Sequence, residues 1–225
     1  MKSKLLIITL FIMSFAGIAT AQNQHDYVDL GLPSGTLWAT CNVGANNPED
    51  YGDYFAWGET SPKELYDWST YKYAKGEYNA LTKYSTISSF DGNYGYNYYI
   101  DSLIILEQSD DVAFQKWGSD WNMPSRLQFQ ELNDICTWTW TTQKGKHGYK
   151  VKGPNGNSIF LPAGGGYCSF GMIDVGTVGY YWSSSLNTGN PCSSIGLVFC
   201  SNQVTPNNWN YRNSGVSVRP VRSKK

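Results

Sequence analysis

The sequence predicts a single α+β domain, in which two helices are followed by hairpins. Ser125 and Gln128 have the S-x-x-Q spacing of a helix capping box. Further along the chain, apolar residues alternate over 195–199 and over 216–218, which is typical of strands that bury one face. A change from helical to strand periodicity along one chain favours the α+β class.

Two helices are expected in the middle of the chain. The first begins near Asp110, an acceptable N-cap, and runs toward Trp117. The second follows the capping box, where Phe129, Leu132 and Cys136 are spaced to form one buried stripe.

Turn residues predict two hairpins and one flexible loop. Residues 27–43 are expected to form strand, turn and strand around Pro33-Ser34-Gly35. A second hairpin is expected over 149–161, because Asn155-Gly156 lies between two apolar segments. Gly164-Gly165-Gly166 indicates a flexible loop, and it is not a phosphate-binding loop because no Lys-Ser/Thr pair or helix start follows it.

Residues 1–21 are expected to be a cleaved export signal. Lys2 and Lys4 precede an apolar run over 5–18, and Ala19-Thr20-Ala21 has the small-x-small pattern that signal peptidase cuts. Residues 22–225 then form the single domain, and no second apolar stretch is long enough to span a membrane. The sequence therefore predicts an exported protein that is periplasmic, cell-surface or extracellular.

The composition argues against nucleic acid as a partner. The net charge of the whole chain is −1, and removal of two signal-peptide lysines makes it more acidic. Such a chain has no basic patch for phosphate groups. Charged residues make up 16% and aromatic residues 16%, a mixture typical of loop-rich extracellular folds.

Fifteen aromatic residues lie between positions 51 and 100, without helical or strand periodicity. Disordered segments are poor in aromatic residues, so an ordered, irregular insertion near 60–105 is expected. Two interpretations stay open. In the first, the rings build a core in place of secondary structure. In the second, the long ordered loop is itself a functional segment.

Six segments together resemble a family of secreted bacterial proteins, the Fibrobacter-type major paralogous domain. The segments are YVDLGLPSGTLWATCNVGA (27–45), YGDYFAWGET (51–60), WGSDWNMPSRLQFQEL (117–132), GNSIFLPAGG (156–165), GYYWSSS (179–185) and GVSVRPVR (215–222). The resemblance implies a C-type-lectin-like fold of the branch that includes formylglycine-generating enzymes. That fold has two helices beside a small twisted antiparallel sheet with long loops.

The cysteines do not support the chemistry of that branch. Cys192 and Cys200 are the nearest candidates for its catalytic pair, but the surrounding NPCSSIGLVFC does not match its active-site segment. Either a local disulfide or two independent thiols are expected there. Export would permit disulfides, and the odd count of five cysteines leaves at least one outside any internal pairing.

No catalytic motif is found elsewhere. Only His25 and His147 could act as an imidazole base, and neither lies in a nucleophile motif. A glycosidase needs two suitably spaced carboxylates, and no spacing singles out a pair among Asp53, Glu59, Glu107, Asp110, Asp111, Glu131 and Asp134. No catalytic residue, metal ligand or cofactor is therefore assigned. A structural calcium stays open, although Trp209-Asn210-Tyr211 lacks the acid of the lectin triplet it approaches.

The strongest candidate for binding is an expected exposed loop over residues 202–213. Aromatic rings offer contact area and amides offer adaptable hydrogen bonds, so we expect ligand contacts there. The predicted contact residues are Asn207, Asn208, Trp209, Asn210, Tyr211, Arg212 and Asn213. The function expected is a secreted, non-catalytic module that recognises a glycan or a cell-surface protein. A carbohydrate hydrolase and a structural envelope or pilus-associated module are the alternatives.

Overall fold

The structure is a computed structural model, and it describes residues 25–86 and 99–224. Its elements in chain order are β1 (Tyr27–Asp29), β2 (Thr36–Ala39), the 3-10 helices η1 (Trp68–Thr70) and η2 (Gln108–Asp110), α1 (Val112–Trp117), α2 (Arg126–Ile135), β3 (Thr137–Gln143), β4 (Lys146–Lys152), β5 (Ser158–Pro162), β6 (Gly166–Cys168), β7 (Gly171–Ile173), β8 (Val178–Leu186), β9 (Ser193–Cys200), β10 (Gln203–Tyr211) and β11 (Val221–Ser223).

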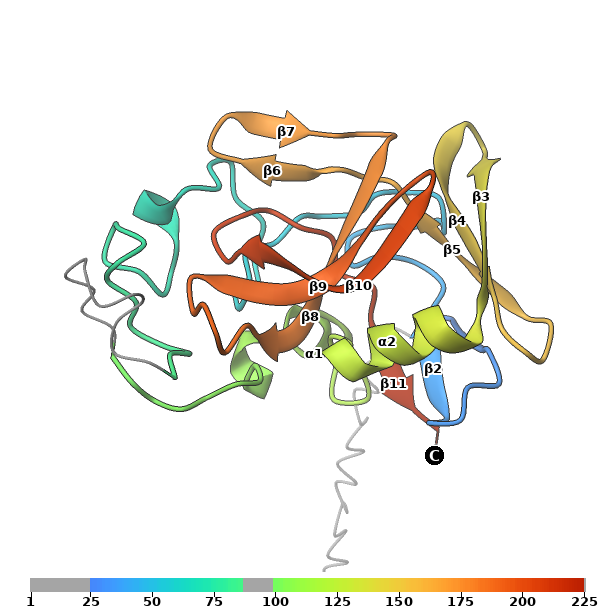
Figure 1. The fold of residues 1–225 in the computed structure, drawn as a ribbon, viewed down its shortest axis with the longest axis horizontal. Helices are drawn as coiled ribbons and strands as arrows, with labels where there is room; N and C mark the ends of the chain where they lie inside the picture. Colours follow the sequence, from blue (N-terminus) through green and yellow to red (C-terminus); the bar gives the residue numbers. More distant parts are fainter. Residues whose placement is uncertain (1–24, 87–98, 225) are drawn as a thin grey trace, which may run out of the picture.

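The strands form four small antiparallel sheets, with the orders β1-β2-β11, β10-β9-β8, β3-β4-β5 and β6-β7. Strand β2 lies between β1 and β11, so the two ends of the described chain meet in one sheet. Figure 1 shows β8, β9 and β10 in the centre, with the β3–β5 sheet to one side and the segment around η1 on the other.

Helix α2 packs on the central sheet and closes one part of the core. Phe129 and Leu132 of α2 are buried beside Trp38 and Phe199. The Trp38 and Phe129 rings lie 5.5 Å apart between their centroids. The stripe predicted for this helix therefore fills the space between α2 and the sheets, as expected for an amphipathic helix.

A second part of the core is built by the aromatic insertion. Trp57, Tyr66 and Tyr84 are buried against Trp182 of β8. Their polar atoms are also satisfied. The Trp57 indole donates to the Ser183 carbonyl at 2.8 Å, and the Tyr66 hydroxyl donates to a backbone carbonyl. Rings and side-chain hydrogen bonds here replace the backbone ladders that this segment lacks.

The expected fold class is wrong. Of the described residues, 37% are in strands and 12% in helices, so the protein is mostly β and not an α+β C-type-lectin-like domain with two helices. Helix α1 covers six residues and ends at Gly118, whose φ of 93° is a left-handed conformation suited to glycine. In the described residues, only α2, with ten residues, is longer than two turns.

Several local expectations are confirmed and others are corrected. The Ser125 capping box is present, and the strand predicted over 195–199 lies within β9. The strand predicted over 216–218 does not form, because Val216 and Ser217 make only isolated bridges. Strands form on both sides of the 153–157 turn. Helix α1, however, is capped by Asp111 and not by Asp110. The expected flexible loop at 164–166 is buried, because Gly165 fits directly against the backbone of β7.

Residues 1–21, the expected export signal, lie outside the described residues. Within the described ranges, no helix is both long enough and apolar enough to cross a membrane. No disulfide joins the cysteines, all of which are described. Cys192 precedes β9 and Cys200 ends it, so the strand holds these two residues apart and the local disulfide does not form.

Gly179 provides a test of the central sheet. It lies opposite Phe199 in the β8–β9 pairing, and a Cβ at this position would overlap the Phe199 ring. We expect Gly179→Ala to lower the free energy of unfolding by about 1–3 kcal/mol, the range for overpacking a core. Urea denaturation measures the change. Gly189→Ala is the control, since the nearest atom to its Cβ would be at 3.5 Å. Equal effects of the two substitutions would contradict this packing.

Candidate functional site

The predicted binding segment is a strand and not a loop. Residues 203–211 form β10, which pairs with β9 along its whole length. Arg212 and Asn213 follow the strand and are buried. The abundance of asparagine suggested a turn, but a bulge explains it in part. Asn207 has a φ of 62°, a left-handed conformation that asparagine adopts more readily than most residues.

The bulge in β10 sets the direction of the following side chains. It inserts one extra residue between Thr205 and Asn208. Such an insertion shifts the alternation of side chains by one position. Trp209 and Tyr211 therefore lie on the face of the sheet that the even-numbered residues of β10 occupy before the bulge. The Asn207 amide donates to Oε1 of Gln130 on α2 at 2.6 Å. This bond ties the bulge to the helix.

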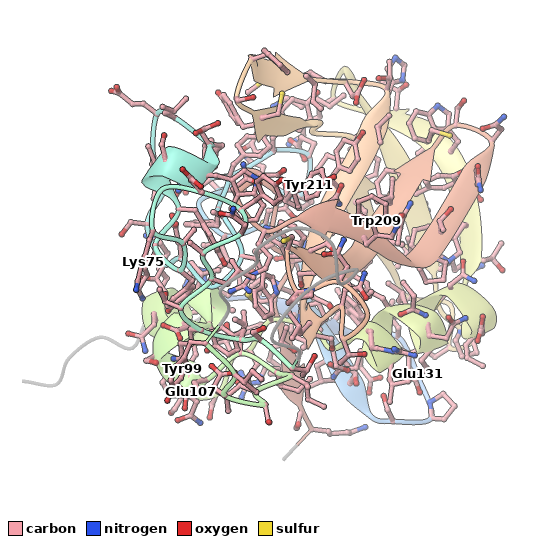
Figure 2. All side chains as sticks on the ribbon, turned by 60° about the vertical axis from the view of Figure 1, so that its left-hand side comes forward. Lys75, Tyr99, Glu107, Glu131, Trp209 and Tyr211 are labelled. Atoms are coloured by element: carbon pink, nitrogen blue, oxygen red, sulfur yellow. The ribbon has the colours of Figure 1, made fainter. Side chains whose placement is uncertain are left out.

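Three aromatic rings from two distant segments form a row, which we call the aromatic strip: Trp209, Tyr211 and Trp68. Trp209 and Tyr211 are each 51% exposed, and their ring centroids lie 5.7 Å apart at an interplanar angle of 73°. Tyr211 also lies 6.3 Å from half-buried Trp68 of η1, again at 73°. Figure 2 shows Trp209 and Tyr211 along β10, with Tyr211 at the end nearer the insertion.

Arg212 is fully buried beneath this end of β10, with a relative exposure of 0%. Its Nε donates to the Tyr71 hydroxyl at 2.8 Å, and its other nitrogens donate to the carbonyls of Lys83, Tyr84 and Pro191 at 3.0 to 3.1 Å. The guanidinium also lies over the Trp57 ring, 4.9 Å from its centroid. Carbonyl oxygens and ring faces thus replace water around the cation.

The same cation positions the third ring of the strip. Tyr71, which receives the Arg212 hydrogen bond, also packs edge-on against Trp68 with centroids 5.6 Å apart. Trp68 begins η1, whose N-cap Asp67 accepts from the Ser69 amide. Arg212 therefore connects β10 to the insertion at the point where Trp68 meets Tyr211. It is a positioning residue, and it is too deeply buried to meet a ligand itself.

The other predicted contact residues have mixed surroundings. Asn208 and Asn210 are half-buried, and the Asn208 side chain accepts from the Trp209 amide at 2.7 Å. Buried amide atoms of Asn207, Asn210 and Asn213 have no hydrogen-bond partner among the described residues. The structure thus displays two of the seven predicted residues, Trp209 and Tyr211, and adds Trp68. Sequence reasoning missed Trp68 because only the fold brings η1 to β10.

The buried carboxylate of Asp110 makes a second set of contacts with the insertion. Asp110 is 2% exposed and accepts from Lys83 at 2.7 Å, Lys72 at 3.1 Å and the Tyr84 hydroxyl at 2.7 Å. Burial alone would raise the pKa of Asp110, but these bonds and one from Tyr73 outweigh it and lower the pKa to about 2. The carboxylate is therefore ionised and held between two lysines.

Three further candidates for chemistry, Asp111, Glu131 and His25, make contacts within the fold. Asp111 caps α1 and also accepts from the Met123 amide, and burial raises its pKa. Glu131 accepts from the Ser34 amide and hydroxyl. His25 stacks on Trp117 with centroids 3.7 Å apart, and burial lowers its pKa.

The three strands of the central sheet contain no charged side chain. Residues 175–211, which include all of β8, β9 and β10, contain no Asp, Glu, Lys, Arg or His. Among the residues that the structure describes, no group of three or more His, Cys, Asp and Glu is placed to hold a metal ion. The aromatic strip therefore presents ring faces and neutral polar groups to solvent.

Arg212 should contribute strongly to stability. We expect Arg212→Met to lower the free energy of unfolding by about 3 kcal/mol or more, because each buried carbonyl that loses its donor costs about 1–3 kcal/mol. Chemical denaturation of the purified protein measures this change. Arg126→Met removes an exposed arginine and should change stability by less than about 0.5 kcal/mol. A small effect at Arg212 would show that the insertion is held by other contacts.

The lowered pKa of Asp110 predicts that the free energy of unfolding falls in acid. The unfolded state takes up its proton near the ordinary pKa of 3.8, whereas the folded state does so at about 2. The stabilisation is therefore complete above about pH 5, and about 2 kcal/mol is lost as the pH falls to about 2. The measurement is the difference in unfolding free energy between the wild type and Asp110→Asn at both pH values. A difference that stays constant with pH would contradict the ion-pair assignment.

Comparisons with known proteins identify no relative. No family model matches the sequence, and no match was found among curated proteins or among solved structures. The resemblance to the major paralogous domain family consequently stays a prediction, and the function must be argued from the geometry of this chain.

Proposed function

We propose that this protein is a non-catalytic binding module that recognises a glycan through the aromatic strip. The observation that carries the proposal is the exposure of Trp209 and Tyr211 on one face of β10, where Trp68 extends the row. Two large rings that are exposed side by side present a contiguous apolar surface, and a ligand that covers it removes that surface from water.

The surroundings of the strip favour a sugar over a protein surface. Sugar rings present C–H groups on their faces, which pack on aromatic rings, while their hydroxyls bond to neutral polar groups. On β8, β9 and β10, the only large apolar side chains that are exposed are Trp209 and Tyr211. The core of a protein interface usually adds aliphatic and methionine side chains to such rings.

The strip is held rigidly at both ends, which supports a binding role. The Asn207–Gln130 bond fixes the bulge before Trp209, and Arg212 fixes the chain just after Tyr211. A ligand that meets rings already in place does not have to order them, so less conformational entropy is lost on binding. We also propose that the protein is exported, from the signal pattern of residues 1–21.

Replacement of Trp209 tests the proposal. We expect Trp209→Ala to lower affinity for the glycan by about fivefold or more, since a packed ring contributes on the order of 1 kcal/mol. The melting temperature should change little, because the ring is already half exposed. The ligand is first identified on a broad glycan array with residues 22–225, and titration calorimetry then compares the variants.

Tyr99→Ala is the matched control, because Tyr99 is an exposed aromatic residue outside the strip. It should bind like the wild type. A blank array would overturn the proposal and favour a protein partner. The β6–β7 hairpin would then be the first surface to examine, since Phe170 at its turn is 96% exposed and Met172 and Ile173 are exposed beside it.

A further inference from the structure

We infer that the aromatic strip takes single, uncharged glycan chains and contacts three consecutive sugar units, rather than one terminal sugar or a flat polysaccharide surface. The inference rests on the proposed function and specifies its ligand class. Three observations carry it: the length of the row, the angles between its rings, and the absence of charge on the sheet beneath it.

The length of the row indicates a chain. Trp209, Tyr211 and Trp68 follow one another with centroid separations of 5.7 and 6.3 Å. These separations are comparable to the advance of a glycan chain by one unit. A single sugar can cover one ring and leaves the others exposed. Because the rings pack edge to face and Trp68 is half-buried, each further unit buries only the part of the next ring that its neighbours leave exposed, and affinity should grow with chain length up to three units.

The ring angles exclude a flat ligand. Successive rings are turned by 73° at each step, so no plane can lie against all three. A single chain in solution can rotate about its glycosidic bonds and present each unit to its own ring. Chains packed in a crystalline polysaccharide cannot rotate in this way. The strip therefore fits a soluble, twisted chain.

The charge distribution disfavours an anionic ligand. Residues 175–211 contain no cationic side chain, and the buried Arg212 has its nitrogens occupied by carbonyls and Tyr71. Lys63, which donates to the Thr70 carbonyl of η1, is neutralised by an ion pair with Glu59. Asp67, next to Trp68, would repel a uronic acid. Neutral hydroxyls instead can bond along β10, because this strand lies at the edge of its sheet. Such binding needs no metal ion and responds little to salt.

The experiment uses residues 22–225 and neutral linear oligosaccharides of one to six units from four series: xylan, cellulose, mannan and β-1,3-glucan. Titration calorimetry should show, in at least one series, a gain of about tenfold per unit up to three units and little beyond. The affinity should not change with chelator or with added salt. Polygalacturonic acid and microcrystalline cellulose should bind weakly.

Trp68→Ala should remove the gain from the third unit while leaving disaccharide affinity near that of the wild type. Because Trp68 is half-buried, its replacement also changes the packing beneath it. Tyr211→Ala therefore serves as a second variant, since Tyr211 is 51% exposed. Its loss should abolish the dependence of affinity on chain length. Binding of single sugars as tight as that of trisaccharides, or preference for charged or crystalline polymers, would overturn this inference alone. Absence of binding to every glycan would overturn the proposed function as well.

Discussion

The buried guanidinium of Arg212 is the interaction on which the rest of the structure depends. It joins the end of β10 to an insertion that has little secondary structure of its own. A backbone without ladders leaves carbonyl groups that must find donors elsewhere. One arginine supplies donors to two such carbonyls, those of Lys83 and Tyr84, and it also donates to the Pro191 carbonyl and the Tyr71 hydroxyl. The Trp57 face covers it. A lysine could not bond in this fork geometry.

The hydrogen bonds of Arg212 also determine the geometry of the aromatic strip. Trp68 comes from the insertion and Tyr211 from the central sheet, so their contact exists only while the two parts are packed together. Asp110 supports the same packing through Lys72 and Lys83. The geometry of the aromatic strip and the stability of the core are thus linked, and loss of the contacts of Arg212 or of Asp110 should alter the spacing of the strip.

The sequence predicted what depends on near neighbours and missed what depends on contacts across the chain. The Ser125 capping box involves residues three positions apart, and the pattern was sufficient to place α2. Strand β3 was missed although its TWTWTT alternation is visible, because it directly follows a helix. Residues 202–213 were interpreted as a loop because asparagine favours turns. Only pairing with β9 shows that a single left-handed Asn207 accommodates residues 203–211 in a strand.

Strand β10 lies at the edge of its sheet, where exposed apolar rings favour unwanted pairing with other chains. The presence of Trp209 and Tyr211 there needs an explanation. An edge strand with apolar side chains and no charge is prone to pair with other chains. Here residues 203–211 contain no lysine or glutamate, and Pro206 and the adjacent bulge interrupt the edge. Replacing Trp209 and Tyr211 by polar residues would reduce that hazard further, and little buried contact would be lost. The proposed glycan would cover both rings and would thus account for their place on this neutral edge.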